Sequence, residues 1–376
     1  GPNARLDGNT MVGRELATIK WTATELAELA AGRLPMSGEF AAEWAVGDVD
    51  AGLAAADLVV DESIYHQSLG HQPLETRSCM AYWENGKVYV YGSTQSTART
   101  VGAVARWAEV EPENVVLVAE FCGGGFGSKG AGSTCMRFPI VMSKKIGKPV
   151  MMRVSRREEN FIGRARPAVQ ARAKVGFRSD GRILAMDLFT IGDGGPYGRS
   201  GDHMSMANIA SLAYQPESIR VRGIGVYTNT PPRAAQRAPG GEQAVTMLAP
   251  LLDRAARQLG IDRTEIIRIN APAGQAAFGA PGRDGQQGNA SSAFVHEALD
   301  KGMVEFNWSE RLRRSGQRNG SKATGIGVAL STFSAGSSGM DGLLVIRPDG
   351  RLQIQSGVGN LGTESFSDCS RAAAEA

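Results

Sequence analysis

One segment of this sequence combines glycines with a serine and a lysine at a spacing that could bind an anion. Residues 123–130 read Gly-Gly-Gly-Phe-Gly-Ser-Lys-Gly, directly after an apolar run over 115–121 and before a helix predicted over 136–145. Glycines let backbone amides turn toward a ligand, and the amides at a helix start carry the positive end of its dipole. The segment therefore predicts a loop that binds phosphate or another anionic group.

Part of this segment also fits the dinucleotide-binding pattern GxGxxG. The match covers residues 125–130, and it would favour a nucleotide-binding dehydrogenase if the second strand ended in an acidic residue. The predicted second strand, 150–154, is instead followed by Ser-Arg-Arg at 155–157. The P-loop pattern fails as well, because Lys129 is followed by Gly130. A nucleotide-binding dehydrogenase remains an alternative at this point.

Two more glycine-rich segments precede predicted helices. The first, 237–243, reads Arg-Ala-Pro-Gly-Gly-Glu-Gln, and Arg237 could stabilise negative charge that develops on a reacting group. The second, 357–365, reads Gly-Val-Gly-Asn-Leu-Gly-Thr-Glu-Ser. Three such loops, each leading into a helix, favour one large anionic ligand with many contacts over three unrelated turns.

Other kinds of chemistry find little support in the sequence. His66, His71 and Glu75 lie close together, but their spacing places them on no common helix or strand face, so we expect no metal site there. The sequence has no GxSxG motif. The four cysteines include no CxxC pair, which argues against structural zinc and against a disulfide framework: Cys79, Cys122, Cys135 and Cys369.

The elements that must position these loops alternate between strands and helices with several hairpins, which predicts an α+β fold. Asn85-Gly86 predicts a hairpin turn, and segments 36–52 and 271–291 read as loops or linkers. Strands are expected at 17–21, 58–60, 80–83, 87–91, 115–121, 150–154, 171–177, 183–191, 219–227, 325–330, 342–346 and 352–356. Helices are expected at 22–31, 97–108, 136–145, 241–259, 294–306 and from about 363.

Composition places the chain among ordinary globular proteins. Its 376 residues are 42% hydrophobic and 21% charged, enough for two or three domains with substantial cores. The net charge of +3 is too small to indicate nucleic acid or an anionic membrane as partner. No run reaches 18 apolar residues, no signal peptide is visible, and Gly1-Pro2 has the form of a protease-cleavage scar. We expect a cytoplasmic protein with reduced thiols.

The order of the motifs resembles the molybdenum-cofactor-binding large subunit of the molybdenum hydroxylases, the family of xanthine dehydrogenases, aldehyde oxidases and aerobic CO dehydrogenases. The resemblance runs from about residue 14 to the last residue. Six segments carry it: the H-x-P-L-E-like 71–77, the STQ segment 93–97, the GGGFGxK loop 123–129, the charged 153–160, the Y-T-N segment 226–230 with 237–241, and 361–365 with 372–375.

This resemblance implies molybdopterin, in bacteria often as the cytosine dinucleotide, carrying molybdenum with no direct protein ligand. The enzymes oxidise an electron-poor carbon, in an aldehyde or an N-heteroaromatic ring, with water as the oxygen source and a glutamate as general base. Electrons leave through two [2Fe-2S] clusters and FAD on partner subunits or domains. By position, Gln95 would hydrogen-bond the apical ligand of the metal, and Arg237 would stabilise charge on the substrate. The implied cofactor-binding residues are Gly124, Gly125, Phe126, Gly127, Ser128, Gly240, Gly241, Arg268, Gly362 and Thr363.

Several positions depart from the family pattern. Gly130 stands where xanthine dehydrogenases carry a substrate-orienting glutamate, which argues against purines, and Ala238-Pro239 replaces the copper-binding cysteine of CO dehydrogenases. Thr363 stands where the family has a glutamine.

The general-base glutamate is expected outside this chain. We therefore expect a partial or split subunit completed by a second polypeptide that packs over 352–376, and a non-catalytic half-subunit that only holds the cofactor remains a further alternative. The expected regions are 1–54, the C-terminal part of the first α/β domain with a connecting loop; 55–320, the first molybdopterin-binding region; and 321–376, the truncated start of the second.

Overall fold

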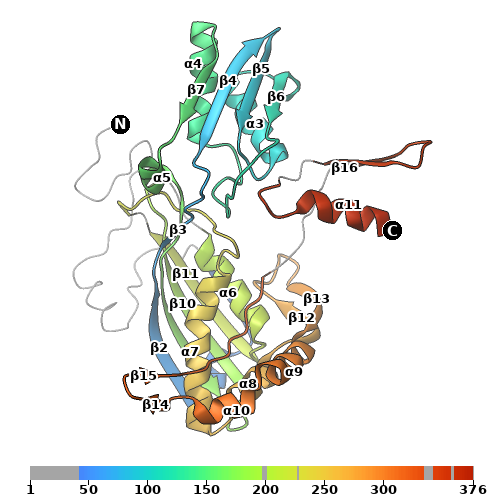
Figure 1. Cartoon of the computed structure of the whole chain (residues 1–376). Helices are drawn as coiled ribbons and strands as arrows, with labels where there is room; N and C mark the ends of the chain where they lie inside the picture. Colours follow the sequence, from blue (N-terminus) through green and yellow to red (C-terminus); the bar gives the residue numbers. More distant parts are fainter. Residues whose placement is uncertain (1–41, 197–200, 227, 334–341, 357–359, 376) are drawn as a thin grey trace. The chain divides into compact units, whose positions relative to one another are not determined.

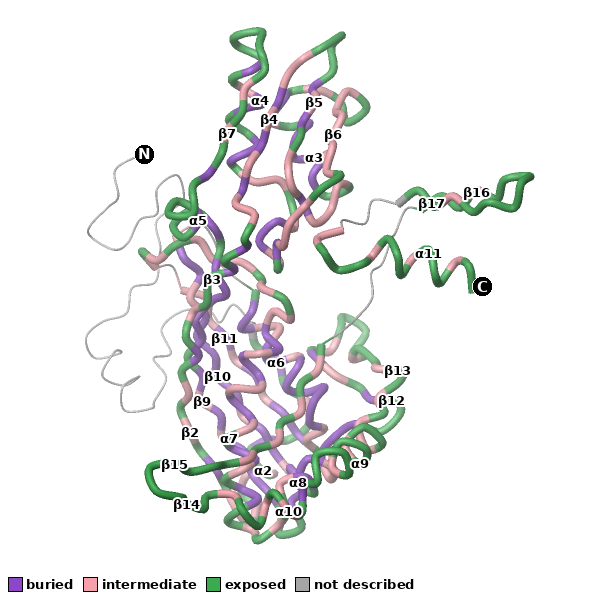
Figure 2. The backbone as a smooth tube through the Cα atoms, in the orientation of Figure 1, coloured by how far each residue is buried: buried purple, intermediate pink, exposed green. Residues whose placement is uncertain are grey.

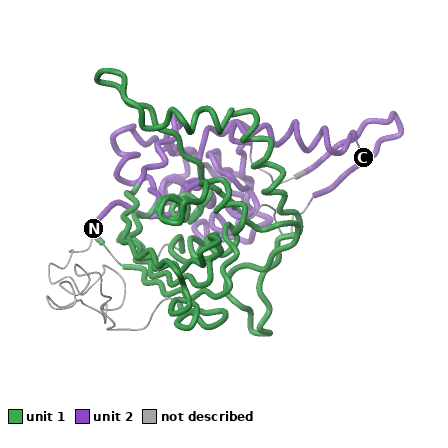
Figure 3. The backbone as a smooth tube through the Cα atoms, turned by 90° about the horizontal axis from the view of Figure 1, so that it is seen from below, with its two compact units in different colours: residues 1–68, 167–229, 238–333 green, residues 69–166, 230–237, 334–376 purple. Residues whose placement is uncertain are grey.

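The computed structural model describes residues 42–196, 201–226, 228–333, 342–356 and 360–375. The strand expected at 17–21 and the helix expected at 22–31 lie outside these residues. The chain forms two compact units, coloured separately in Figure 3: unit 1 comprises residues 1–68, 167–229 and 238–333, and unit 2 comprises 69–166, 230–237 and 334–376. Each unit is built from distant parts of the sequence. The predicted division at 54/55 and 320/321 stays a prediction.

Unit 1 is built on a five-stranded sheet that its helices cover (Figure 1). Neighbouring strands pair antiparallel except for one parallel pair, β10 with β11. The strands form because apolar side chains alternate or run continuously through them, so that one face can be buried. In sheet order the strands are β1 (Ala42–Val46), β11 (Ser218–Val226), β10 (Ile183–Asp193), β9 (Val169–Phe177) and β2 (Leu58–His66).

The core of unit 1 lies between this sheet and helices α6 (Asp202–Ala213), α7 (Gly241–Leu259) and α8 (Arg263–Asn270). Met247, Leu251 and Ala255 recur along α7 at helical spacing and are buried against the sheet. Figure 2 shows this concentration of buried residues. The remaining elements are α2 (Val49–Ala54), α9 (Val295–Phe306), α10 (Trp308–Arg314), the hairpin of β12 (Ala273–Phe278) and β13 (Gly288–Phe294), and the short pair β14 (Arg318–Asn319) and β15 (Lys322–Ala323).

Unit 2 contains a four-stranded sheet in the order β6-β5-β4-β7. Helices α3 (Thr97–Ala108) and α4 (Thr134–Ile146) pack on one face over a small core that includes Val88, Val90 and Ile140. The strands are β4 (Ser78–Glu84), β5 (Lys87–Gly92), β6 (Val115–Val118) and β7 (Val150–Arg153). The other elements are β3 (Leu69–Gly70), η1 (Pro112–Asn114), α5 (Arg156–Ile162), β8 (Ala165–Arg166), β16 (Gly342–Ile346), β17 (Leu352–Ser356) and α11 (Ser365–Glu375).

Most of the expected elements are confirmed, and the fold is α+β as predicted. Helices α3 and α7 have the predicted bounds. Asn85 and Gly86 have φ of 50° and 76°, the left-handed pair that a tight hairpin turn requires. Strand β6 is shorter than expected and only half-buried, because it forms one edge of its sheet.

Three expectations were wrong. From residue 42 onward the supposed loop 36–52 holds β1 and the start of α2, and 271–291 holds β12 and the first residues of β13. Glycine and alanine give β12 no strand propensity, so pairing with β13 must define it. Residues 325–330 form no strand: Val328 and Leu330 pack on the core of unit 1 from irregular chain. Helix α6 had no predicted counterpart because it is buried on nearly every side, polar residues included, and so has no amphipathic stripe.

Candidate functional site

The glycine-rich loop 123–130 belongs to unit 2 and connects β6 to α4. It turns tightly at Phe126 and Gly127, whose φ values are 53° and 109°, and Ser128 N–H donates to Gly125 O at 2.8 Å. Its position in the sequence had indicated that the loop leads directly into a helix, but in the structure it does not. Helix α4 begins at Thr134, after its N-cap Ser133, so any ligand of this loop is held by backbone amides without the helix dipole.

Three consecutive amides of the loop are left for a ligand. None of the described residues accepts a hydrogen bond from the N–H of Gly124, Gly125 or Phe126. Successive N–H groups around a left-handed residue form a concave site for anionic or strongly polar atoms. A large anionic cofactor such as molybdopterin fits this donor set.

The glycines are required by the loop's own packing. A Cβ at Gly127 would overlap Ala235 O, and a Cβ at Gly125 would overlap Oε1 of Gln95. A Cβ at Gly124 would lie 2.6 Å from Cζ of Phe126. The sequence had suggested that glycine lets the backbone approach a ligand; in the structure the space beside these Cα atoms is occupied by neighbouring protein atoms. Substitutions here would therefore disturb the loop itself.

Gln95 lies against this loop with its side-chain oxygen fully used. Oε1 accepts from Gly127 N–H at 2.9 Å and from Lys129 N–H at 3.0 Å, and Gln95 N–H donates to Lys129 O at 2.8 Å. These bonds fix which end of the carboxamide faces the loop. The Nε2 group has no acceptor among the described residues, so it is the end left to donate to a ligand.

Arg237 is tied to the same loop through its backbone. Its N–H donates to Phe126 O at 2.8 Å, and its carbonyl accepts from Nη2 of the buried Arg166 at 2.6 Å. Its guanidinium lies over the Phe126 ring, 5.8 Å from the centroid. The structure thus brings Gln95, the loop and Arg237 together within one unit.

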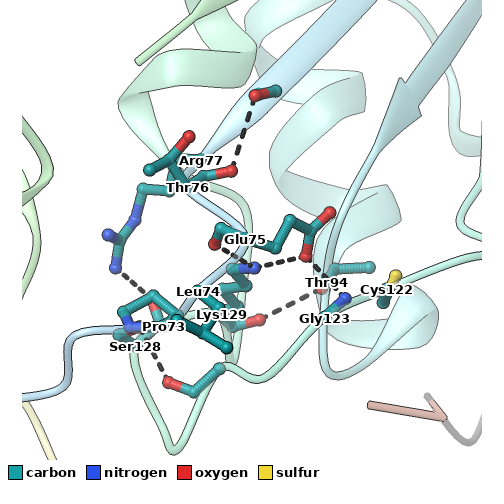
Figure 4. Close-up of polar contacts among 12 residues, drawn as sticks. Pro73, Leu74, Glu75, Thr76, Arg77, Thr94, Cys122, Gly123, Ser128 and Lys129 are labelled. Carbon is teal, nitrogen blue, oxygen red and sulfur yellow. Dashed lines mark hydrogen bonds and ion pairs between the residues drawn. The ribbon is translucent and has the colours of Figure 1, made fainter. Parts of the chain in front are cut away.

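Charged side chains make ion pairs and hydrogen bonds that fix the backbone of the loop (Figure 4). Nζ of the buried Lys129 lies 2.5 Å from Oε2 of Glu75 and 3.0 Å from its carbonyl oxygen. Gly123 N–H donates to the same Oε2 at 2.6 Å. Arg77 pairs with Glu159, both buried, and donates to Ser128 O at 3.0 Å. Because Lys129 is directed to Glu75, it does not serve as a phosphate-binding lysine.

His71 connects two backbone segments of this site. Its Nδ1 lies 2.6 Å from Arg164 O, and its Nε2 lies 3.0 Å from Ala235 O. Burial lowers the pKa of His71 most, and the charges of Arg77 and Arg166 lower it further, while the two carbonyl contacts oppose the shift. Cys122 directly precedes Gly123 of the loop. The pKa of its thiol is raised, chiefly by burial, so it is a poor nucleophile.

The other predicted cofactor residues lie elsewhere. Gly240 and Gly241 are in unit 1, at the start of α7: Gly240 has φ of 81°, and a Cβ there would overlap the backbone of Met206 in α6. Arg268, also in unit 1, pairs with Asp300 and Glu265, and Asp300 contributes most to raising its pKa.

Gly362 and Thr363 precede α11. Gly362 has φ of 80°, and the Thr363 hydroxyl contacts the Ser365 hydroxyl at 2.7 Å. No contact recorded among the described residues joins either position to the loop at 123–130. For this pair, as for Gly240, Gly241 and Arg268, a cofactor role stays a prediction.

Sequence reasoning missed the residues that brace the loop. His71 and Glu75 were considered only as metal ligands, which the spacing argued against, and as motif positions, while Arg77, Glu159 and Arg166 were given no role. Charged residues buried at long sequence separation leave no local periodic signal, because their partners are fixed by the tertiary fold. In the described ranges no cluster of three or more His, Cys, Asp or Glu side chains could hold a metal ion. No helix within those ranges has the length and apolarity to cross a membrane.

The structural context removes support for the dinucleotide-binding alternative. A dinucleotide fingerprint joins a strand to a helix within a parallel βαβ unit. Here β6 and β7, the strands on either side of the loop and α4, are at opposite edges of the sheet, and β7 pairs antiparallel with β4.

Comparison with known proteins gives one consistent result. Residues 35–271 match the model of the molybdopterin cofactor-binding domain. A probable hypoxanthine oxidase of Escherichia coli O157:H7 is 28% identical over 352 residues, which are 88% of this chain and 35% of that protein. The xanthine dehydrogenase molybdenum-binding subunit of the same organism is 28% identical over 324 residues, covering 84% of this chain and 42% of the subunit.

A solved structure has the same fold. The aldehyde oxidoreductase of Desulfovibrio gigas superposes with a TM-score of 0.76 at 24% identity, over 91% of this chain and 38% of that one. The chain thus spans well under half the length of each of these proteins. The family match covers more than half of the chain, and it includes Gln95, the glycine-rich loop and Arg237. The chain belongs to the molybdopterin cofactor-binding domain family, the family of the xanthine dehydrogenase and aldehyde oxidoreductase molybdenum-binding subunits.

Proposed function

We propose that this chain forms part of a molybdenum hydroxylase and holds one side of its molybdopterin cofactor, in the cytosine dinucleotide form. The observation that carries the proposal is the arrangement of Gln95, the loop amides and Arg237 in unit 2 of a chain that belongs to this cofactor-binding family. When bound, the cofactor supplies a two-electron oxidation of an electron-poor carbon, with the inserted oxygen coming from water.

Each of these groups has a role that follows from its geometry. The N–H groups of Gly124, Gly125 and Phe126 bind polar atoms of the cofactor, and the turn through Gly127 and Ser128 sets their direction. Nε2 of Gln95 would be the donor to a ligand of the metal, because Oε1 is held by the loop.

Arg237 supplies a fixed positive charge close to the loop. Its backbone is pinned at both N–H and C=O, so its guanidinium can stabilise negative charge on the substrate with little reorganisation. Gly240, Gly241, Arg268, Gly362 and Thr363 complete the proposed cofactor contacts.

The substrate we propose is an aldehyde or an N-heteroaromatic compound. Gly130 has no side chain to orient a purine, and Ala238 and Pro239 next to Arg237 offer no thiolate for copper. Both features argue against xanthine and CO as substrates.

Several partners complete the enzyme in this proposal. A second polypeptide supplies the general-base glutamate, and subunits with [2Fe-2S] clusters and FAD take the electrons, all in the cytoplasm. The hairpin of β16 and β17 is largely exposed, as is α11 (Figure 2). It supports a covering partner, since one face has four exposed apolar side chains in register, and α11 adds the exposed Phe366. The four are Leu344, Ile346, Leu352 and Ile354.

Elemental analysis and one variant test the function. We expect molybdenum in the purified complex, and Arg237→Lys should lower turnover on the order of tenfold to a thousandfold, because lysine lacks the planar fork of arginine. NAD binding without molybdenum would favour the dehydrogenase instead. If Arg237→Lys leaves turnover unchanged, Arg237 has only a structural role.

The need for a partner is tested on the 376-residue chain alone, by size-exclusion chromatography with mass measurement. We expect no turnover without the second polypeptide. A monomer that binds the cofactor and turns over substrate unaided would contradict this part of the proposal. A reconstituted complex that retains molybdenum but oxidises no aldehyde or N-heteroaromatic compound would favour the non-catalytic half-subunit.

A further inference from the structure

Within unit 2, Lys129 connects its own glycine-rich loop to the segment that carries Glu75 and to the segment that carries Gln95. Its side chain is 1% exposed, and its Nζ lies 2.5 Å from Oε2 of Glu75 (Figure 4). The same Nζ donates to the Glu75 carbonyl at 3.0 Å. Gly123 N–H donates to Oε2 at 2.6 Å, so one carboxylate oxygen connects both ends of the loop.

The backbone of Lys129 makes a second set of contacts, all toward Gln95. Lys129 N–H donates to Gln95 Oε1 at 3.0 Å, and Lys129 C=O accepts from Gln95 N–H at 2.8 Å. Thr94, the residue before Gln95, also donates its hydroxyl to Lys129 O at 3.2 Å. A displacement of Lys129 therefore displaces one of the two donors to Gln95 Oε1 and the acceptor of the Gln95 backbone N–H.

We propose that Glu75 and Lys129 are positioning residues for Gln95: their ion pair closes the glycine-rich loop so that the amides of Gly127 and Lys129 hold Oε1 and leave Nε2 as the free donor. The inference rests on the proposed function only for what Nε2 faces, the apical ligand of the molybdenum. The ion pair and the amide bonds are properties of this chain and can be tested on it directly.

The burial of Lys129, whose partner Glu75 is about one third exposed, explains why the loop depends on the pair. A buried ammonium group that loses its carboxylate partner keeps its desolvation penalty and must find water or another acceptor. For Lys129 the way to water is to move the loop, because its side chain is enclosed by the segment that carries Glu75. Loss of either charge should therefore open the loop at the Gln95 bonds first.

A double-mutant cycle tests whether the pair acts through Gln95. Hydrogen exchange of the Gly127 amide, which donates to Gln95 Oε1, is measured in the wild-type chain, Lys129→Met, Gln95→Met and the double variant. We expect Lys129→Met to speed this exchange by about tenfold, the effect of losing one hydrogen bond of charged character. In the Gln95→Met background the same change should add less than about twofold.

Two results would overturn the proposal: unchanged Gly127 exchange in a folded Lys129→Met chain, or the same acceleration with and without Gln95. The control is Lys144→Met, which removes the lysine of an exposed pair with Glu109 (3.7 Å) in the same unit and should leave Gly127 exchange unchanged. If Lys129→Met does not fold, Glu75→Asp decides between the same outcomes, because it keeps the charge but withdraws the carboxylate by one methylene.

The complete complex provides the second readout. We expect Lys129→Met to lower its molybdenum content as Gln95→Met does, with no further loss in the double variant, whereas Lys144→Met keeps the wild-type content. A wild-type complex without molybdenum would defeat the proposed function and leave the exchange result standing. Wild-type molybdenum content in Lys129→Met, with Gln95→Met depleted, would overturn the positioning role.

Discussion

The two units of this chain are held together in different ways. Unit 1 has a large apolar core between five strands and three helices, and most of its ion pairs lie on its surface. Unit 2 has a small apolar core beneath α3 and α4, and the glycine-rich loop lies outside that core. Charged pairs hold the loop instead: the buried Lys129 with the partly exposed Glu75, and the buried pair of Arg77 and Glu159.

This difference has a physical reason. Apolar packing tolerates small shifts and gives no direction, whereas a hydrogen bond to a charged group fixes a backbone carbonyl at one distance and angle. Arg77, Lys129 and Arg166 each donate to the carbonyl of a site segment, at Ser128, Glu75 and Arg237. With these carbonyls fixed, the backbone of the loop keeps one conformation, and the N–H groups of Gly124, Gly125 and Phe126 keep fixed directions.

The largest expected effect comes from breaking the pair of Arg77 and Glu159. Glu159→Gln leaves the Arg77 guanidinium buried without its counter-charge, and it weakens the bond from Arg77 N–H to Oε2 (3.1 Å). We expect the free energy of unfolding of unit 2 to fall by about 3–5 kcal/mol. Urea unfolding, followed by the exchange of amides in β4 and β5, measures this change.

The matching change in unit 1 is Asp61→Asn, which removes the partner of Arg172. This pair is bidentate at 2.8 Å but about one third exposed on each side, so we expect a loss below about 1 kcal/mol. If the two variants lose equal stability, buried charge does not distinguish the units. If Glu159→Gln has the wild-type free energy of unfolding, the pair orients the loop but does not stabilise unit 2.

Local elements of both units were readable from the sequence, although the contrast between them was not. The helix of α7 follows from its apolar stripe, and the hairpin at Asn85-Gly86 follows from turn chemistry. Both predictions were confirmed because each depends on residues that are neighbours in the chain. The motifs also led to Gln95, the glycine-rich loop and Arg237, which the structure brings together in unit 2, while their roles toward a ligand stay predictions.

The parts that failed depend on contacts between distant residues. The α6 helix lacks an amphipathic pattern because it is enclosed, and Val328 with Leu330 packs on a core without joining a sheet. The role of Glu75 is set by Lys129, 54 residues away, and that of Arg77 by Glu159, 82 residues away. No local pattern encodes which of several charged residues will meet in the interior.

A substitution in the core of unit 1 tests whether loss of apolar packing there affects the loop of unit 2. Leu251 in α7 is 1% exposed, and Leu251→Ala should cost about 2–5 kcal/mol through lost burial and the cavity left behind. Because the loop is held by charges within unit 2, we expect the exchange of the Gly127 amide to stay at the wild-type rate under native conditions. Acceleration there equal to that in β10 would show that the two units unfold as one.

The smallest expected effect concerns acid and His71. Its pKa is lowered by burial, with Arg77 from its own segment and Arg166 from β8 adding to the shift against two carbonyl contacts. The unfolded state then takes up a proton near pH 6.5 that the folded state takes up only at lower pH. The contribution of His71 is thus fully present above about pH 6.5 and is lost as the pH falls below it.

Unit 2 should therefore lose stability between pH 7 and pH 5, with a slope from this one group of at most about 1.4 kcal/mol per pH unit. His71→Gln removes the titrating ring but keeps one amide donor for Arg164 O or Ala235 O, so the slope should decrease while the variant stays close to wild type in acid. Urea unfolding of both chains at pH 5, 6, 7 and 8 measures the slopes. The value at pH 8, where the ring is neutral in both states and donates one hydrogen bond as glutamine can, measures the change in packing alone. A wild-type slope no steeper than that of His71→Gln would mean that His71 braces Ala235 without any link to pH.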